Sequence, residues 1–385
     1  MRYKLKDIFD LQIGKTPSRN NSEYWNTEDH KWISIADLTR TGKYISETKE
    51  YLSENAIQKS GIKVIPANTV VMSFKLSIGK TAITAEDMYS NEAIMAFLDK
   101  HVVEVLPEYI LYMFKFKNWD EGSNEAVMGK TLNKAILSEI EIDICPIEEQ
   151  RVIVDVLDKM MLALENRENE LFLLDDLIKA RFVEMFGNSV LNEKGWITDT
   201  VDNLCKEIYG GGTPSKVHPE YYKDGDIPWV SSKDMKTDIL TDSQIKINQM
   251  GVENSTARMV PVNSVIMVIR SGILKHTLPV AINAVPITVN QDLKVFIPSE
   301  RILTRFLAVQ FKMHEKDILT GVRAVTADNI EFNSLKQRKL IVPSIELQQE
   351  YVLFLEQVDK SKVAVQKALD ETQMLFDSLM QKYFG

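Results

Sequence analysis

Two long segments of the chain carry apolar side chains at alternating spacings of three and four residues. The first spans residues 147–187 and the second spans residues 345–385. The apolar stripe of the first segment consists of Ile153, Leu157, Met160, Leu164, Leu171, Leu174, Ile178 and Met185. The stripe of the second segment consists of Tyr351, Leu355, Val358, Val365, Leu369, Phe376, Leu379 and Tyr383. Neither segment contains Pro or Gly before its final Phe-Gly. Because a sustained repeat of about 3.5 residues is typical of coiled coils, each segment is predicted to form one long helix.

The stretches before these two helices show a different pattern, in which short apolar runs are separated by Gly, Pro, Asn and Ser. Six of these runs are predicted as strands, at residues 31–38, 68–74, 91–98, 227–232, 264–270 and 292–298. Residues 107–116 and 300–315 are predicted as helices. Each stretch is therefore expected to fold as an α+β domain.

The second half of the chain repeats the first at a period of about 197 residues. Gly14-Lys-Thr-Pro-Ser18 corresponds to Gly211-Gly-Thr-Pro-Ser215. At the same offset, Tyr24, Trp32, Ser34 and Asp37 correspond to Tyr221, Trp229, Ser231 and Asp234. With small shifts, Val64–Met72 resembles Met259–Met267, Asn91-Glu92 resembles Asn290-Gln291, and Pro146–Gln150 resembles Pro343–Gln348. A duplication retained only for stability would not explain why the segments between these positions differ, so two modules with the same task and different targets are favoured.

The repeat predicts a fold of the α+β class with a pseudo-two-fold internal repeat. Two globular domains, at residues 1–146 and 188–344, are joined by the two long helices at 147–187 and 345–385. A helix that packs only on its own domain would explain either stripe taken alone. Two equivalent stripes favour pairing of the helices with each other, as an antiparallel coiled coil.

Charge neither supports nor excludes a nucleic-acid partner. The net charge is −9, but residues 147–187 hold 5 basic and 10 acidic residues, and residues 345–385 hold 4 and 7. The rest of the chain is therefore nearly neutral and has enough Lys and Arg to form a basic face. No apolar run is long enough for a membrane helix, the N-terminus lacks a signal-peptide pattern, and two cysteines give no disulfide framework. We therefore expect a cytoplasmic protein without a membrane partner.

Motifs of the common catalytic and cofactor sites are missing from the sequence. Gly-Lys-Thr occurs at 14–16, 79–81 and 129–131, but a phosphate-binding P-loop needs a further Gly five residues earlier, where Phe9, Phe74 and Asn124 stand. A Pro-Pro pair, as in the base-holding loop of adenine methyltransferases, is missing, and so is a nucleophile elbow. The five histidines and two cysteines have no metal-ligand spacing. We therefore expect a binding protein with no catalytic residues, metal or cofactor.

Three segments of each copy combine basic and hydroxyl side chains in a way that suits DNA. Gly allows close backbone approach, hydroxyl groups can donate to phosphates, and Arg can contact guanine with two hydrogen bonds. The candidate residues in the first copy are Lys15, Thr16, Ser18, Arg19, Lys75, Lys80, Lys130, Thr131 and Lys134. Those in the second copy are Thr213, Ser215, Lys216, Lys233, Arg270, Ser271, Lys275, His276, Arg323 and Thr326. For each of them a turn or a solvated surface position is the alternative, and Trp32 and Trp229 are predicted as core aromatics.

At the repeated positions the chain resembles the specificity subunit of type I restriction-modification systems, over its whole length. The resemblance rests on the order of several motifs. These are the Gly-x-Thr-Pro-Ser loop, Trp229-Val-Ser-Ser-Lys-Asp234, the strand followed by Arg270-Ser-Gly, Asn290-Gln-Asp-Leu-Lys294, the helix starts Pro146-Ile-Glu-Glu-Gln150 and Pro343-Ser-Ile-Glu-Leu-Gln348, and Lys179-Ala-Arg-Phe-Val-Glu-Met-Phe-Gly187. The first copy departs from the second at Lys75-Leu-Ser and at Asn91-Glu92.

The resemblance implies two target-recognition domains, each contacting one half of a bipartite site in double-stranded DNA. It also implies that the helices set the spacer between the half-sites and dock two adenine methyltransferase subunits, and through these a restriction-translocase subunit. Two alternatives of other kinds are a non-catalytic coiled-coil adaptor and a methyltransferase or nuclease with an unusual active site. A specificity subunit of a fused-type restriction system is a close variant of the main interpretation.

Overall fold

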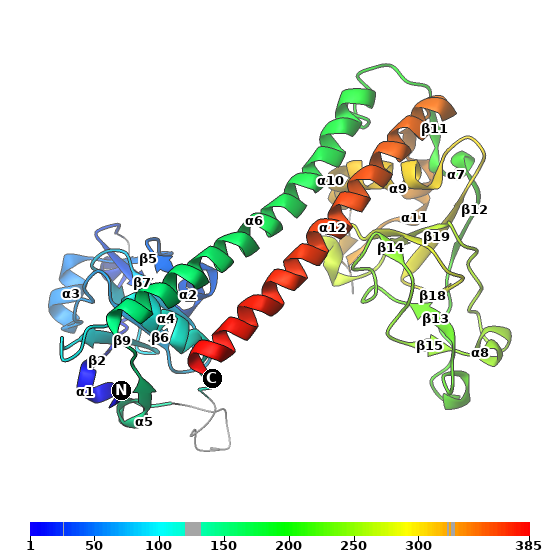
Figure 1. Ribbon diagram of the computed structural model, residues 1–385. Helices are drawn as coiled ribbons and strands as arrows, with labels where there is room; N and C mark the ends of the chain where they lie inside the picture. The colour runs from blue at the N-terminus through cyan, green and yellow to red at the C-terminus, as the bar shows by residue number, and fades with distance from the viewer. Residues whose placement is uncertain (26, 120–131, 322, 325–327) are drawn as a thin grey trace. The chain divides into compact units, whose positions relative to one another are not determined.

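The computed structural model describes residues 1–25, 27–119, 132–321, 323–324 and 328–385, and it divides into two units (Figure 1). Unit 1 consists of Met1–Glu168 with Lys367–Gly385, and unit 2 consists of Asn169–Gln366. Helices α6 (Ile147–Phe186) and α12 (Ile345–Phe384) therefore contribute one part to each unit.

Unit 1 is built on a five-stranded sheet with strand order β2-β9-β6-β7-β4 and a three-stranded sheet with order β5-β3-β8. Its strands are β1 (Arg2–Lys4), β2 (Phe9–Ile13), β3 (His30–Ile33), β4 (Tyr44–Ile45), β5 (Glu50–Leu52), β6 (Val70–Ser73), β7 (Thr81–Thr84), β8 (Tyr89–Ser90), β9 (Ile94–Asp99) and β10 (Glu141–Asp143). Its shorter helices are α1 (Leu5–Ile8), η1 (Ser22–Tyr24), α2 (Ile35–Arg40), α3 (Glu54–Ser60), α4 (Pro107–Phe116) and α5 (Lys134–Glu139). The largely apolar α4 packs against β6 and β7, and β1 pairs with β10 next to the start of α6.

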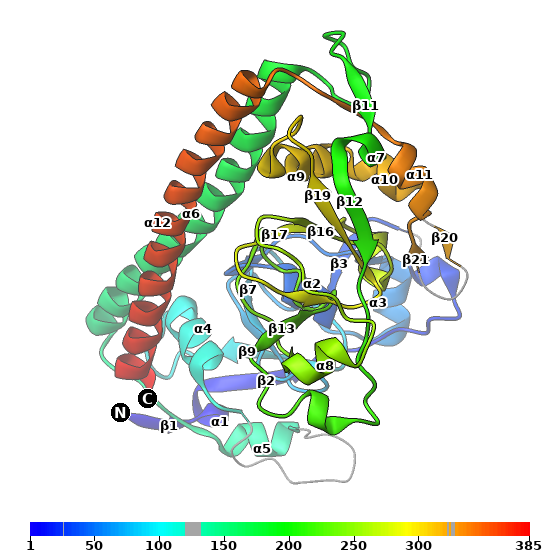
Figure 2. The same cartoon turned by 90° about the vertical axis from the view of Figure 1, so that its right-hand side faces the viewer.

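Unit 2 repeats this arrangement, with the strand orders β12-β19-β16-β17-β14 and β15-β13-β18. Its strands are β11 (Thr198–Thr200), β12 (Cys205–Gly210), β13 (Ile227–Val230), β14 (Ile239–Leu240), β15 (Lys246–Ile247), β16 (Val265–Val268), β17 (Val280–Asn283), β18 (Thr288–Val289), β19 (Leu293–Pro298), β20 (Arg323–Ala324), β21 (Asp328–Asn329) and β22 (Lys339–Ile341). Its shorter helices are α7 (Val201–Leu204), η2 (Pro219–Tyr221), α8 (Gln249–Glu253), η3 (Gly272–Lys275), α9 (Thr304–Met313), α10 (Glu315–Thr320) and α11 (Phe332–Gln337). Figure 2 shows β12 beside β19, and α9 packs against β16, β17 and β19 as α4 packs in unit 1.

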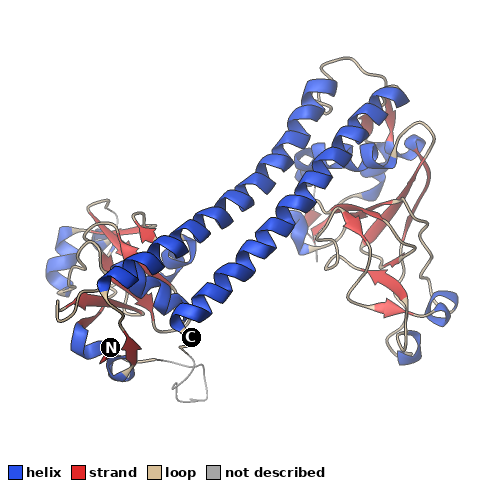
Figure 3. Ribbon diagram, viewed as in Figure 1, coloured by secondary structure: helices blue, strands red, loops and turns tan. Residues whose placement is uncertain are grey.

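The predicted fold class is confirmed. Both units mix helices and strands (Figure 3), and the five-stranded and three-stranded sheets of unit 2 repeat the strand order of unit 1. The parallel pairs repeat as well, because Trp32 of β3 pairs with Tyr89 of β8, and the equivalent Trp229 of β13 pairs with Thr288 of β18.

Two of the predicted elements differ most from the structure in their bounds. The strand predicted at 31–38 ends at Ile33, because Ser34 caps α2 and forms a reciprocal capping box with Asp37. The helix predicted at 300–315 begins at Thr304 and ends at Met313, and α10 continues after His314. In both cases local hydrogen bonding decides where the element ends, and the apolar pattern does not reveal it.

The two long helices run antiparallel in unit 2. The Tyr351 hydroxyl donates to the Ile178 carbonyl over 3.0 Å, and Arg181 pairs with Glu350 over 3.0 Å. In unit 1, Ile153 and Leu157 of α6 belong to the same buried cluster as Met380 of α12. Most of the predicted stripe is buried or half-buried, but Phe182 and Phe186, both fully buried, lie outside it.

A buried glutamine fixes the start of each long helix on its own domain. Gln150 accepts from the Leu106 amide over 2.9 Å and donates to the Glu104 and Cys145 carbonyls. Gln348 makes the same three bonds in unit 2, with partners Leu303, Arg301 and Pro343. Because every polar atom of these buried amides has a partner, the segments Pro146–Gln150 and Pro343–Gln348 have the same structural role in their units.

Candidate nucleic-acid interface

The Gly-x-Thr-Pro-Ser loop of unit 1 lies directly against the turn before β9. The Gly14 amide donates to the Ile94 carbonyl over 3.1 Å, and the Lys15 amide donates to the Ser90 carbonyl over 2.8 Å. A Cβ atom at Gly14 would stand 2.2 Å from the Asn91 carbonyl oxygen. Only glycine therefore allows the loop to approach the backbone this closely.

The equivalent loop of unit 2 is held in the same way. The Gly212 amide donates to the Val289 carbonyl over 3.0 Å, and a Cβ atom at Gly211 would stand 1.8 Å from the same carbonyl oxygen. The two loops thus pack on equivalent turns, although the residue between Gly and Thr differs.

Two tryptophans hold these loops from the core side. The Trp32 indole N–H donates to the Lys15 carbonyl over 3.1 Å, and the Trp229 indole donates to the Gly212 carbonyl over 2.9 Å. Both rings are buried, which agrees with the prediction of core aromatics. Each indole also satisfies a loop carbonyl, a role that the sequence pattern did not indicate.

The loop threonine bonds the residue after the turn asparagine in both units. Thr16 donates to the Glu92 carboxylate, and Thr213 donates to the Gln291 side-chain oxygen. The hydrogen bond from Thr16 lowers the pKa of Glu92, and the nearby charges of Lys75 and Arg19 act in the same direction. Unit 1 therefore keeps a carboxylate at a position where unit 2 has a neutral amide.

The segment after β6 or β16 reaches the same turn. In unit 1 the Phe74 amide, next to Lys75, donates to the Ala93 carbonyl over 2.9 Å. In unit 2 the Arg270 amide donates to the Asp292 carbonyl over 3.2 Å, and its guanidinium pairs with the Asp292 carboxylate over 2.6 Å. The contact with Asp292 was not predicted, because the two residues lie in different motifs of the sequence.

The third predicted segment also adjoins Arg270 in unit 2. Asn329 of β21 forms an isolated bridge with Arg270, and the Ile330 amide donates to the Ile269 carbonyl over 2.9 Å. Of the candidate residues in this segment, Lys130, Thr131 and Thr326 lie outside the described residues, and Arg323 is described only as backbone in β20. In unit 1, Lys134 is exposed as the first residue of α5.

We call the convergence of these segments in each unit the loop cluster. It comprises 14–19, 74–80 and 91–93 in unit 1, and 211–216, 269–276 and 290–292 in unit 2. The structure brings together the first and second predicted segments, which are about 60 residues apart in the sequence. Lys233 is exposed at the end of β13, whose residue Val230 accepts from the Asn290 amide over 2.9 Å.

Several candidate side chains already have protein partners. The Arg19 guanidinium pairs with Glu50 over 2.5 Å and stacks 3.8 Å from the centre of the Trp25 ring. Lys80 donates to the Thr39 hydroxyl over 2.5 Å, and Lys15 donates to the Ser60 carbonyl. Ser18, Ser215, Lys216 and His276 are other candidates with exposed side chains, and Ser215 Oγ accepts from the Val217 amide over 3.3 Å. The outer surface of each cluster thus offers hydroxyl and cationic groups.

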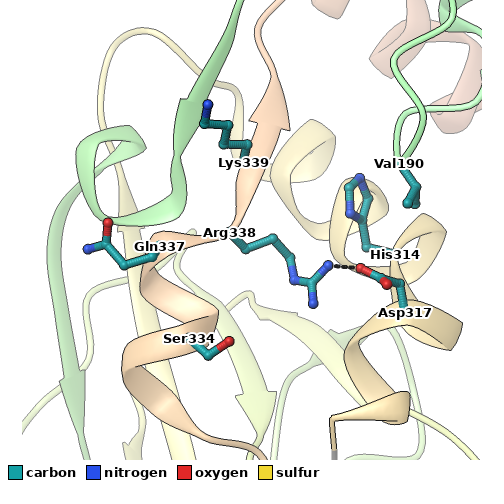
Figure 4. Close-up of a pocket in the computed structure, with 7 residues that line it drawn as sticks. All are labelled: Val190, His314, Asp317, Ser334, Gln337, Arg338 and Lys339. Atoms are coloured by element: carbon teal, nitrogen blue, oxygen red, sulfur yellow. Dashed lines mark hydrogen bonds and ion pairs between the residues drawn. The ribbon is translucent and has the colours of Figure 1, made fainter.

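A separate hollow of about 360 Å³ lies in unit 2, away from the loop cluster in the sequence (Figure 4). It is lined by Val190, His314, Asp317, Ser334, Gln337, Arg338 and Lys339. Both ring nitrogens of the buried His314 lack a hydrogen-bond partner, and desolvation lowers the pKa of His314 to about 4. His314 is therefore neutral at physiological pH.

No group of three or more His, Cys, Asp or Glu side chains among the described residues is arranged to hold a metal ion. No helix in those ranges has both the length and the apolarity needed to cross a bilayer.

Comparison with known proteins places the chain in a family. The family described as type I restriction modification DNA specificity domain matches twice, at residues 1–171 and 193–372. The MjaIX type I restriction enzyme specificity subunit of Methanocaldococcus jannaschii is 24% identical over 401 residues, covering 98% of this chain and 91% of that protein. The EcoR124I/EcoR124II specificity subunit of Escherichia coli is 38% identical over 153 residues, covering 39% of this chain and 38% of that protein.

The fold agrees with this assignment. The crystal structure of the type I restriction-modification S subunit from M. genitalium superposes with a TM-score of 0.57 at 13% identity, covering 100% of this chain and 96% of that one. The two matched domains, the duplicated α+β units and the paired long helices support the same assignment as this superposition. The chain belongs to the family of type I restriction-modification specificity subunits and has two target-recognition domains.

Proposed function

We propose that each unit of this chain contacts one half of a bipartite site in double-stranded DNA through its loop cluster. The observation that supports this most directly is that the same cluster is built twice, from segments that diverge elsewhere. An Arg with a fixed guanidinium, such as Arg270 beside Asp292, suits the major-groove edge of guanine. Lys75 occupies the equivalent place in unit 1, so the two half-sites are expected to differ.

The chain in this proposal has no catalytic role and acts as the DNA-binding subunit of a methyltransferase and restriction complex in the cytoplasm. The long helices would set the spacer and dock two adenine methyltransferase subunits, which in turn recruit a restriction-translocase subunit. Exposed apolar side chains on α6 support a protein partner there. They are Val152, Leu162, Phe172, Leu173, Leu177 and Val183, each at least 46% exposed. Acidic residues on the same helices make DNA a poorer partner for these faces.

The experiment is to map methylated adenines by single-molecule sequencing in cells with the gene intact, deleted and restored. We expect a two-part motif with a fixed spacer to lose methylation in the deletion and to regain it on restoration. An active methyltransferase subunit is supplied in all three strains, so that a silent partner cannot explain a missing signal. Unchanged methylation in the deletion would contradict the proposal and favour a coiled-coil adaptor.

A further inference from the structure

The outer part of the Gly-x-Thr-Pro-Ser loop has the same exposure in both units. Pro17 and Pro214 are buried, whereas the Ser and the basic residue that follow are exposed. These exposed residues are Ser18 and Arg19 in unit 1, and Ser215 and Lys216 in unit 2. Ser215 Oγ accepts from the Val217 amide over 3.3 Å, which leaves its hydroxyl hydrogen able to donate outward. Both loops therefore present one hydroxyl and one basic residue at the surface, and in unit 1 the Arg19 guanidinium is also paired with Glu50.

The inner part of the loop is fixed by the same contacts in both units. An indole N–H bonds the carbonyl before the threonine, and the threonine hydroxyl bonds the side chain after the turn asparagine. These contacts persist although Lys15 is replaced by Gly212 and Glu92 is replaced by Gln291. The geometry of the loop is thus independent of the charge at one loop position and at one position of the turn that it contacts.

The neighbouring segment differs between the units in both sequence and backbone. After β6, Leu76 has a left-handed backbone with φ of 65° and is 88% exposed. After β16, Ser271 instead caps the short helix η3, which includes Lys275. Each cluster therefore combines one segment of constant geometry with one segment of variable geometry.

We propose that the two segments divide the work of DNA binding. The Gly-x-Thr-Pro-Ser loop contacts the phosphate backbone and sets the register of each domain, whereas the segment after β6 or β16 contacts base edges. Thr16, Glu92, Thr213 and Gln291 are then positioning residues, which hold the loop without touching DNA. This inference rests on the proposed function and adds to it an assignment of phosphate and base contacts.

The physical reason lies in what each part of DNA presents. Phosphate geometry is nearly the same for every sequence, so a loop of constant shape can bind it in both half-sites. Base edges present different donors and acceptors, so a segment that reads them has to differ between two half-sites of different sequence. Hydroxyl and cationic groups on a loop of constant shape are suited to phosphate contact. Arg270, which is held by Asp292, is suited to contact with base edges.

The test uses the full-length chain assembled with its methyltransferase subunits and short DNA duplexes. Binding is measured for the cognate site, for a site altered in the second half, and for unrelated DNA. In the Thr213→Val variant we expect affinity to fall about three- to tenfold on all three duplexes, since one fixed contact is weakened. The ratio of cognate to altered affinity stays unchanged, and Thr213→Ser restores binding because it restores the hydroxyl.

Two further variants separate the segments. Arg270→Ala is expected to lower the ratio of cognate to altered affinity about tenfold or more, because base readout is lost. Thr16→Val is the matched control in unit 1, and it should reduce affinity on all three duplexes without changing the ratio of cognate to altered affinity. A thermal melt of each variant checks that Thr213, an exposed residue, is not needed for folding.

Two results would overturn different claims. If Thr213→Val changes which base is preferred, or if Thr213→Ser fails to restore binding, the assignment of the loop to phosphate contact is wrong while the proposed function stands. If the unmodified complex binds all three duplexes equally, the proposed function itself is contradicted.

Discussion

The two units share their buried hydrogen bonds but fill their cores with different side chains where the long helices meet the domains. In unit 2 this place is aromatic, with Phe182, Phe186, Phe306 and Tyr351 in mutual contact. The equivalent residues of unit 1 are Met380, Phe384, Tyr109 and Ile153, of which only Tyr109 and Phe384 form a ring contact, at 5.4 Å. By contrast, Gln150 and Gln348 make the same three hydrogen bonds.

This difference shows which features of a duplicated fold tolerate change. A hydrogen bond needs a donor and an acceptor within a few tenths of an ångström, so a buried glutamine has few substitutes. An apolar cluster needs volume and shape, which several combinations of side chains supply. The buried hydrogen bonds at the start of the long helices are therefore the same in both units, whereas the apolar residues around them are free to diverge.

The largest effect is expected at the equivalent residues Phe186 and Phe384. Phe186 is fully buried, so Phe186→Ala should lower the free energy of unfolding by about 3–5 kcal/mol. Phe384 is only half-buried, and Phe384→Ala should cost about half as much or less. Urea unfolding followed by circular dichroism measures both. Equal losses would mean that the aromatic cluster of unit 2 contributes no more than the mixed cluster of unit 1.

Much of the fold could be predicted from the sequence because its signals are long or repeated. Both long helices follow from a periodic stripe, and the repeat predicts that each domain has the same elements. The segment 107–116 is helical as predicted, because apolar residues occupy most of α4. Phe182 was missed because it lies outside the stripe with the predicted spacing, on the face that meets the domain.

The candidate interface was predicted in part. The sequence indicated which segments carry hydroxyl and basic residues, and the structure brings two of them together in each unit. It did not indicate that Arg19 pairs with Glu50 or that Thr16 bonds Glu92, a residue 76 positions away. Contacts between exposed polar residues of distant segments leave no periodic signal, so only the fold reveals them.

A second prediction concerns how the stability of unit 2 depends on pH. His314 has a pKa lowered to about 4 by burial, whereas the equivalent residue of unit 1 is Lys117. Between pH 6.5 and about 4 the unfolded chain binds a proton at His314 that the folded chain does not. The free energy of unfolding should therefore fall by about 2–3 kcal/mol as the pH drops through this window.

The variant His314→Asn isolates this contribution. Denaturation curves at pH 7 and pH 4.5 are compared for the unmodified chain and the variant, so that other titrating groups cancel. The variant should lose less stability on acidification than the unmodified chain. Lys117→Gln is the matched control in unit 1, and it should leave the pH dependence as it is. If His314→Asn also leaves the pH dependence of the free energy of unfolding unchanged, His314 is protonated as readily in the folded chain as in the unfolded chain.

The smallest expected effect lies on the helix pair, where an ion pair of unit 2 replaces apolar residues of unit 1. Arg181 and Glu350 correspond to Leu379 and Val152 at the repeat offsets. Because Glu350 is 57% exposed, Glu350→Gln should lower the free energy of unfolding by about 0.5 kcal/mol or less, and the loss should vanish in 1 M salt at a Debye length of about 3 Å.

The double variant Arg181→Leu with Glu350→Val places the apolar pair of unit 1 into unit 2. It should be neutral or stabilising, since apolar packing often equals or exceeds the contribution of an ion pair. Urea unfolding at low and high salt measures the single and double variants together. A double variant that is less stable than Glu350→Gln would show that Arg181, which also lies 5.9 Å from the centre of the Phe354 ring, packs better than leucine there. A polar side chain on the exposed face of the helix pair would then contribute to stability, in addition to the buried glutamines.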